Sequence, residues 1–206
     1  MTVLLLDIEG TVCPLAFVHD VMFPFARARL DAWVAAHPDD ALLADVRAEG
    51  GPNVATTLHA WMDADRKHTA LKAIQGRIWR AGFASGALVA PLYPDVRPVI
   101  EAWRAAGARV AIYSSGSAEA QRLLFGHTTE GSLLPLLDAF FDTTVGAKRD
   151  VGAYTAIAAA LAVAPGDVCF CSDIREEIDA AVAAGMRAVW ITREGAGGAA
   201  TLPRPG

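Results

Sequence analysis

The sequence predicts an α/β fold: a doubly wound, mostly parallel sheet with a helical region inserted after the first strand. Short apolar runs alternate with longer segments of helical spacing in residues 87–206, and several of the runs end abruptly at an acid or a serine. Between Phe17 and Gly86 the alternation stops and only helical periodicity remains. A chain of 206 residues with 53% hydrophobic content is long enough for one such core and a smaller insertion.

The first expected element is a buried strand, and the insertion follows it. The apolar run Val3–Leu6 stops at Asp7, which is typical of a parallel strand that is covered on both faces. The insertion contains three amphipathic helical regions, at Phe23–Val34, Leu58–Met62 and Leu71–Trp79. We therefore predict one domain formed by residues 1–16 and 87–206, and an inserted helical domain formed by residues 17–86.

The remaining elements alternate along the chain. Asp95 is expected to cap a helix that Gly107 ends. After it we expect a strand at Arg109–Tyr113, a helix at Ala118–Phe125, a weaker strand at Phe140–Thr144, a helix at Tyr154–Val163, a strand at Val168–Cys171, a helix at Glu176–Ala184 and a strand at Ala188–Ile191. This order predicts a Rossmann-like core. Gly195-Ala-Gly-Gly198 lacks the spacing of a dinucleotide-binding loop, and the tail Ala199–Gly206, with two prolines, is expected to fray.

Composition narrows the range of partners and compartments. The chain has 18 basic and 23 acidic residues, a net charge of −5 and no basic run, which argues against a nucleic-acid or anionic-membrane partner. No segment approaches the roughly 18 apolar residues of a membrane span, and the N-terminal apolar run is too short for a secretory signal. Three cysteines, Cys13, Cys169 and Cys171, suit a reducing cytoplasm, where we expect the last two to pack in the core.

Polar residues follow several of the predicted strands. Asp7 and Glu9 follow the first strand, Ser114-Ser115-Gly116 the second, Lys148 the third and Asp173 the fourth. Ligands of an open parallel sheet bind outside the carboxyl ends of its strands, so these residues are candidates for one site. Taken singly, each has an ordinary structural explanation: Asp7 and Asp173 could cap helices, and Lys148 could be a solvated surface lysine.

The residue types at these positions suit phosphoryl transfer. Asp7 can attack phosphorus and form an aspartyl-phosphate, which divides hydrolysis into two steps. Carboxylates of Asp7 and Asp173, with the backbone carbonyl of Glu9, can bind Mg²⁺, which prefers oxygen ligands. The side chain of Glu9 then remains available to protonate the leaving oxygen and later to activate water.

Two further groups can hold the substrate. Ser114, with the backbone N–H groups of Ser115 and Gly116, can bind the non-reacting phosphoryl oxygens, although this segment could also be an ordinary helix cap. Lys148 can neutralise charge on Asp7 and on the transferring group.

The four ordered motifs resemble those of the haloacid dehalogenase-like phosphatase superfamily: Asp7-Ile-Glu9-Gly-Thr, Ser114, Lys148 and Ser172-Asp173. The glutamate at position 9, where most of the superfamily has aspartate, is typical of one branch. Longer segments resemble that branch, the acireductone-forming enolase-phosphatases of methionine salvage: Leu6–Thr11, Phe17–Asp20, Met22–Phe25, Tyr113–Ser117, Leu123–His127 and Phe141–Lys148.

The resemblance implies a bifunctional enzyme with one Mg²⁺ per subunit. It would enolise 2,3-diketo-5-methylthiopentyl-1-phosphate and hydrolyse the enol phosphate to the acireductone 1,2-dihydroxy-3-keto-5-methylthiopentene. The base for enolisation stays open, with Glu9 as one candidate. The family is described as monomeric, so the partner would be a small phosphate ester alone. Two alternatives remain: a related phosphatase for another small ester, and a non-catalytic phospho-ligand binding protein.

The resemblance also implies that the helical domain is a cap over the active site. Its large apolar side chains could line the space for a methylthio tail or could form the cap's own core; these are Trp61, Met62, Trp79 and Phe83. The polar residues His59, Lys67 and His68 could touch substrate or lie on a solvated helix face.

Overall fold

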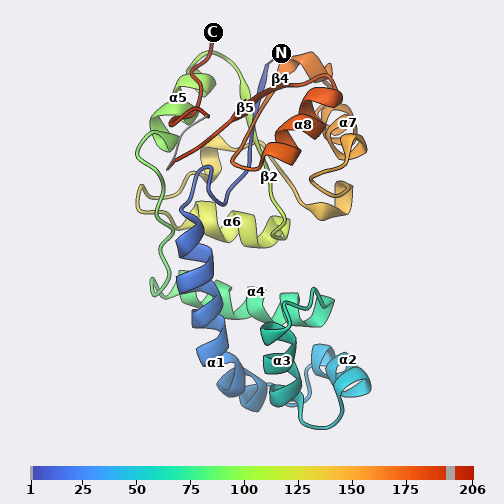
Figure 1. Ribbon diagram of the computed structural model, residues 1–206. Coiled ribbons are helices and arrows are strands. Elements are labelled where there is room, and N and C mark those ends of the chain that lie inside the picture. The colour runs from blue at the N-terminus through green and yellow to red at the C-terminus, as the bar shows by residue number, and fades with distance from the viewer. Residues whose placement is uncertain (1, 194–197) are drawn as a thin grey trace. The chain divides into compact units, whose positions relative to one another are not determined.

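The computed structural model describes residues 2–193 and 198–206, so most of the glycine segment at 195–198 lies outside the described residues. The chain forms two compact units (Figure 1). The sheet unit comprises Met1–Leu15 and Val89–Gly206, and the helical unit comprises Ala16–Leu88. No helix in the described part of the chain is long and apolar enough to cross a membrane.

The sheet unit contains five parallel strands in the order β3-β2-β1-β4-β5. They are β1 (Val3–Leu6), β2 (Arg109–Tyr113), β3 (Ala139–Phe141), β4 (Val168–Ser172) and β5 (Arg187–Trp190). The chain builds outward from β1 on one side and then crosses to β4 on the other, so the order reverses between β1 and β4. The predicted doubly wound α/β sheet is confirmed, and its reversal point is where such sheets bind ligands.

Helices flank this sheet on both sides. They are α5 (Val96–Ala105), α6 (Ala118–Gly126), α7 (Val151–Ala160) and α8 (Arg175–Ala183), with short 3-10 turns at Leu134–Leu136, Thr143–Val145 and Pro165–Asp167. Tyr154 and Ile157 of α7 and Ala181 of α8 pack with alternate residues of β1 in one apolar cluster. Figure 1 shows α7 and α8 together, with α5 on the other side of the sheet. All four residues of β1 are buried, which explains its unbroken apolar sequence.

Two expectations for this unit are wrong. Asp95 stands before α5 but makes no side-chain cap, because its carboxylate pairs with Arg193 and with the backbone of Leu202 instead. The tail is also not frayed. Leu202 is buried, and the Trp103 indole N–H donates to the carbonyl of Pro203 at 2.7 Å. Hydrogen bonds between residues far apart in the sequence thus hold both Asp95 and the tail, and no local sequence pattern reveals them.

Smaller differences concern element boundaries. The third strand is shorter than the predicted Phe140–Thr144, because the chain turns into a 3-10 helix at Thr143. Helix α7 begins three residues earlier than expected, at Val151 after Asp150. Cys169 and Cys171 are free and buried, as expected for core packing, and Cys13 is free and buried as well.

The helical unit contains a π-helical turn, Phe17–Met22, and the helices α1 (Phe23–Ala36), α2 (Ala41–Gly50), α3 (Val54–Asp63) and α4 (Thr69–Ala84). Side chains from all four α-helices form its own apolar core, which includes Leu30, Leu43, Leu58 and Ile74. Trp61 belongs to this core, and Met62 and Trp79 pack against it. Three of the four apolar residues considered as substrate contacts thus serve the unit's own packing, and the fourth, Phe83, is buried.

The polar residues singled out in this unit have partners within it. His59 Nε2 lies 2.8 Å from Asp31, and Lys67 Nζ lies 2.5 Å from Asp65. His68 caps α4, because its Nδ1 accepts the N–H of Ala70 at 3.1 Å.

Candidate active site

Asp7 lies at the end of the central strand and contacts Lys148. Its backbone N–H donates to the carbonyl of Cys171 at 2.9 Å, which extends the pairing of β1 with β4. Lys148 Nζ donates to Asp7 Oδ1 at 2.5 Å, although the two residues are 141 positions apart. Both side chains are largely buried. The strand end therefore carries a carboxylate held beside a cation in a site of restricted solvent access.

Glu177 is a member of this cluster that sequence reasoning missed. Its Oε2 lies 2.7 Å from Lys148 Nζ and accepts the hydroxyl of Ser172 at 2.8 Å. The Ser172 hydroxyl also lies 3.4 Å from Asp7 Oδ2. Glu177 lies in the first turn of α8, four residues after Asp173. An acid at that position is normally explained by its favourable interaction with the helix dipole. The signal that could have found it is its spacing to the buried Ala181, because residues four apart lie on the same face of a helix.

The charges around Lys148 decide its protonation. Burial alone would lower the pKa of Lys148, but the carboxylates of Asp7 and Glu177 outweigh it and raise the pKa above the ordinary value. Burial is the main cause that raises the pKa of Glu177, against the opposing effect of Lys148. Lys148 is therefore a fixed ammonium group between two acids.

Two buried tyrosines hold the loop that carries Lys148. The Tyr154 hydroxyl donates to the carbonyl of Lys148 itself at 2.6 Å, and the Tyr113 hydroxyl donates to the carbonyl of Gly146 at 3.1 Å. Burial raises the pKa of both tyrosines, so they remain donors. Gly146 has φ +138°, and a Cβ there would lie 2.9 Å from the Cβ of Ala153. Only glycine fits this close approach.

Asp173 follows β4 and is held through its backbone. Its N–H donates to Thr11 Oγ1 at 3.0 Å, and its carbonyl accepts the Trp190 indole N–H at 2.8 Å. Burial, followed by the charge of Asp7, raises the pKa of the Asp173 carboxyl to about 6. Its Oδ1 is buried without a hydrogen-bond partner. An isolated buried carboxylate oxygen is costly unless a proton or a cation meets it.

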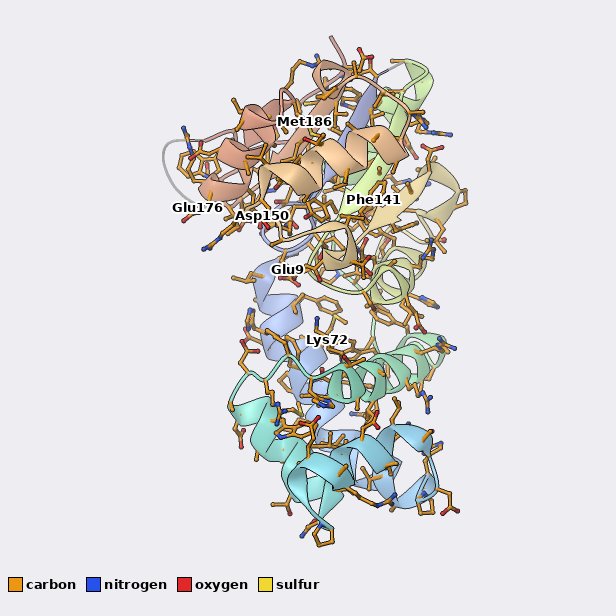
Figure 2. The ribbon with its side chains drawn as sticks, turned by 90° about the vertical axis from the view of Figure 1, so that its right-hand side faces the viewer. Glu9, Lys72, Phe141, Asp150, Glu176 and Met186 are labelled. Atoms are coloured by element: carbon orange, nitrogen blue, oxygen red, sulfur yellow. The ribbon has the colours of Figure 1, made fainter. Side chains whose placement is uncertain are left out.

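Glu9 lies in a tight turn directly after Asp7. The N–H groups of Val12 and Cys13 both donate to the carbonyl of Ile8, at 2.8 and 3.0 Å, and close the turn. Gly10 has φ +70°, and a Cβ there would lie 2.1 Å from Asp173 Oδ2, so the turn packs directly on Asp173. Figure 2 shows Glu9 at the same edge of the sheet unit as Asp150, which precedes α7, and Glu176, in the first turn of α8.

Ser114, Ser115 and Gly116 form the loop after β2. Ser114 is buried and Ser115 exposed; the Ser114 N–H donates to the carbonyl of Phe141 at 3.2 Å, and its hydroxyl accepts the N–H of Gly116 at 3.3 Å. Buried Gln121 supports the loop by donating to the carbonyls of Gly116 and Phe141. The cap of α6 is Ser117, not Ser114. Strand pairing places this loop beside Asp7, because Ile112 pairs with Leu6.

The donor set fits one hard cation. Among the described residues, no group of three or more His, Cys, Asp or Glu side chains could hold a metal ion. Two carboxylates do stand close enough for the charge of Asp7 to raise the pKa of Asp173, and Asp173 has an unpartnered oxygen. Two carboxylates and a backbone carbonyl, completed by water, suit Mg²⁺, which keeps several waters when it binds to proteins.

A family model, related sequences and a solved structure all resemble this chain. The family model of haloacid dehalogenase-like hydrolases matches residues 1–185, a range that includes Asp7, Lys148 and Asp173. Enolase-phosphatase E1 of Acidiphilium cryptum is 54% identical over 98% of this chain and 89% of its own length. Enolase-phosphatase E1 of Sorangium cellulosum is 50% identical over 93% and 88%. The crystal structure of the UTR4 protein from Saccharomyces cerevisiae superposes with a TM-score of 0.80 at 30% identity, covering 92% of this chain and 88% of that one.

Proposed function

We propose a function from one premise: this chain belongs to the enolase-phosphatase E1 family, within the haloacid dehalogenase-like hydrolases. It is a phosphatase with enolase activity in methionine salvage. It enolises 2,3-diketo-5-methylthiopentyl-1-phosphate and hydrolyses the enol phosphate to the acireductone 1,2-dihydroxy-3-keto-5-methylthiopentene. The observation that carries the assignment to this site is the 2.5 Å contact of Lys148 with Asp7 at the end of the central strand.

In this proposal Asp7 is the nucleophile. A carboxylate oxygen of Asp7 attacks phosphorus, the bond from phosphorus to the ester oxygen breaks, and an aspartyl-phosphate forms. Lys148 offsets the negative charge that gathers on Asp7 and the phosphoryl group, and Glu177 keeps the ammonium group in place. Ser114 and the N–H groups of Ser115 and Gly116 bind the phosphoryl oxygens that do not react.

Glu9 is the acid and base of the hydrolysis. Its carboxyl gives a proton to the departing enol oxygen, and its carboxylate then accepts a proton from the water that attacks the aspartyl-phosphate. Inorganic phosphate leaves and Asp7 is restored. Enolisation removes a proton from the carbon that bears the phosphate, which the neighbouring carbonyl acidifies, and the oxygen of that carbonyl gains a proton to give the enol. Glu9 is the candidate base for that step because it serves the adjacent ester oxygen.

Asp7, Asp173 and the backbone carbonyl of Glu9 would hold one Mg²⁺. When bound, the ion supplies positive charge that lets a carboxylate approach a phosphate ester. The unpartnered oxygen of Asp173 and its raised pKa support this assignment, because a cation would meet both the unpaired atom and the excess negative charge.

We further propose that the sheet unit is the catalytic core and the helical unit a cap that limits access of water. We propose that the protein works as a cytoplasmic monomer on a small phosphate ester, without nucleic acid or membrane. The net charge of −5 argues against nucleic acid and anionic membranes as partners, and the three free, buried cysteines suit a reducing cytoplasm.

The test is turnover of the diketo phosphate by the purified protein with Mg²⁺. We expect phosphate release together with a transient enol that absorbs in the ultraviolet. Phosphate release without that enol, or much faster turnover of a sugar phosphate, would instead indicate a phosphatase for another ester. Absence of turnover on any ester, with phosphate binding that survives Asp7→Ala, would indicate a non-catalytic binding protein.

A further inference from the structure

Arg193, just after β5, is buried against the turn that follows β1. Its Nε donates to the carbonyl of Thr11 at 2.9 Å, and its Nη2 donates to the same carbonyl. Its guanidinium also lies 4.3 Å from the ring centre of Tyr93. Arg193, from the last part of the chain, therefore holds the backbone of the turn that contains Glu9 and Gly10 by hydrogen bonds.

The other end of the guanidinium joins two more segments. Nη1 donates to Asp95 Oδ1 at 2.7 Å and to the carbonyl of Ala200 at 3.0 Å. The second carboxylate oxygen of Asp95 accepts the N–H of Leu202 at 2.7 Å. The pair thus fastens the tail to the start of α5 and both to the turn after β1. This use of the Asp95 carboxylate explains why it does not cap the helix.

We call Arg193 and Asp95, with the bonds that they make, the clamp. Thr11 connects the clamp to the candidate metal site. While its carbonyl accepts both bonds from Arg193, its hydroxyl accepts the backbone N–H of Asp173. Thr11 is fully buried, so neither set of bonds competes with bulk solvent. Its neighbour Gly10 lies against the Asp173 carboxylate. A shift of the Thr11 peptide would therefore move both the turn and the backbone of Asp173.

We propose that Arg193 is a positioning residue for the metal site, acting through Thr11 on Asp173 and the Glu9 turn. The planar guanidinium group donates to the Thr11 carbonyl and to the Asp95 carboxylate at the same time. The ammonium group of lysine does not reproduce this geometry. Partners outside the ligand shell orient the ligands, and their loss typically costs about 10- to 100-fold in metal affinity or activity. The inference rests on the proposed function, since that supplies the role of Asp173.

The test compares Arg193→Lys and Arg193→Met with Arg104→Met. Arg104 also pairs with an aspartate of the sheet unit, Asp138 at 2.6 Å, but Asp138 precedes β3 at the opposite edge of the sheet. We would measure Mg²⁺ binding by calorimetry, the Mg²⁺ dependence of kcat, and Tm with and without Mg²⁺. Both Arg193 variants should bind Mg²⁺ roughly 10- to 100-fold more weakly, and Arg104→Met should bind it as the wild type does.

The outcomes separate positioning from mere stability. If Arg193→Met lowers Tm but keeps the wild-type Mg²⁺ affinity and kcat, the clamp is only structural and the inference is overturned. If the wild type itself shows no Mg²⁺-dependent turnover, the proposed function fails, whereas calorimetry still compares the variants.

Thr11→Val provides a second test in case the arginine variants do not fold. It removes only the hydroxyl that accepts the Asp173 N–H and leaves the Thr11 carbonyl for Arg193. We expect weaker Mg²⁺ binding here as well, and a double variant with Arg193→Met that loses less than the sum of the two single losses. Wild-type Mg²⁺ affinity in Thr11→Val would overturn the route through Thr11.

Discussion

The two units differ in how deeply their most buried ion pairs lie. In the sheet unit the decisive pairs are buried: the side chains of Lys148 and Asp7 are 10% and 6% exposed. In the helical unit the pairs lie at the surface, as in Lys67 and Asp65, whose side chains are 67% and 82% exposed. A buried pair is expensive to break because it leaves an uncompensated charge, whereas an exposed pair is screened and contributes little. The sheet unit has exposed pairs as well, such as Arg175 with Asp179, but its candidate site adds the buried pairs of Lys148 with Asp7 and Glu177.

The largest expected effect is the loss of the nucleophile. Asp7→Asn keeps the size of the side chain, but an amide does not form an acyl-phosphate, so we expect phosphate release to fall by roughly a thousandfold or more. A phosphate assay with saturating substrate and Mg²⁺ measures this, and circular dichroism checks that the fold persists. Retention of more than a few per cent of the activity would contradict the assignment of Asp7.

A lysine substitution in each unit sharpens the contrast of buried and exposed pairs. Lys148→Met leaves the carboxylates of Asp7 and Glu177 facing each other without their cation, so we expect a loss of about 3–5 kcal/mol in the free energy of unfolding, together with loss of activity. Lys67→Met, the matched control, should leave both unchanged within error. Urea unfolding compares the two. Equal losses would show that burial does not distinguish the pairs.

The smallest expected effect concerns Cys13 in the sheet unit. Burial, with a smaller contribution from the charge of Glu9, raises the pKa of its thiol to about 12. The thiolate is the reactive form, so the native thiol should resist alkylation at pH 8–9. Because the folded-state pKa lies above the unfolded value of 9.0, the contribution of Cys13 to stability is complete below pH 9 and declines as the pH rises toward 12. Mass spectrometry after iodoacetamide treatment, with and without urea, measures the protection, and rapid native labelling of Cys13 would contradict it.

The sequence predicted the sheet and the residues at its strand ends because both follow from local pattern. An apolar run that stops at Asp7 or Asp173 signals a strand and its polar end at once. Glu177 was missed because an acid in the first turn of a helix has an ordinary explanation. The pairing of Arg193 with Asp95 was missed, and Asp95 was assigned to a helix cap instead, because no spacing rule covers a contact between positions 98 apart. The tail looked unfolded for the same reason, since its bonds run to Asp95 and Trp103.

The position of β1 in the middle of the sheet has a consequence for biosynthesis. Of the five strands it is synthesised first, and its neighbours β2 and β4 begin only at Arg109 and Val168. This wholly apolar strand therefore stays unpaired until β2 has been synthesised, whereas the helical unit needs only residues 16–88 for its own packing. Nascent chains should consequently expose this apolar segment until β2, and then β4, has been synthesised.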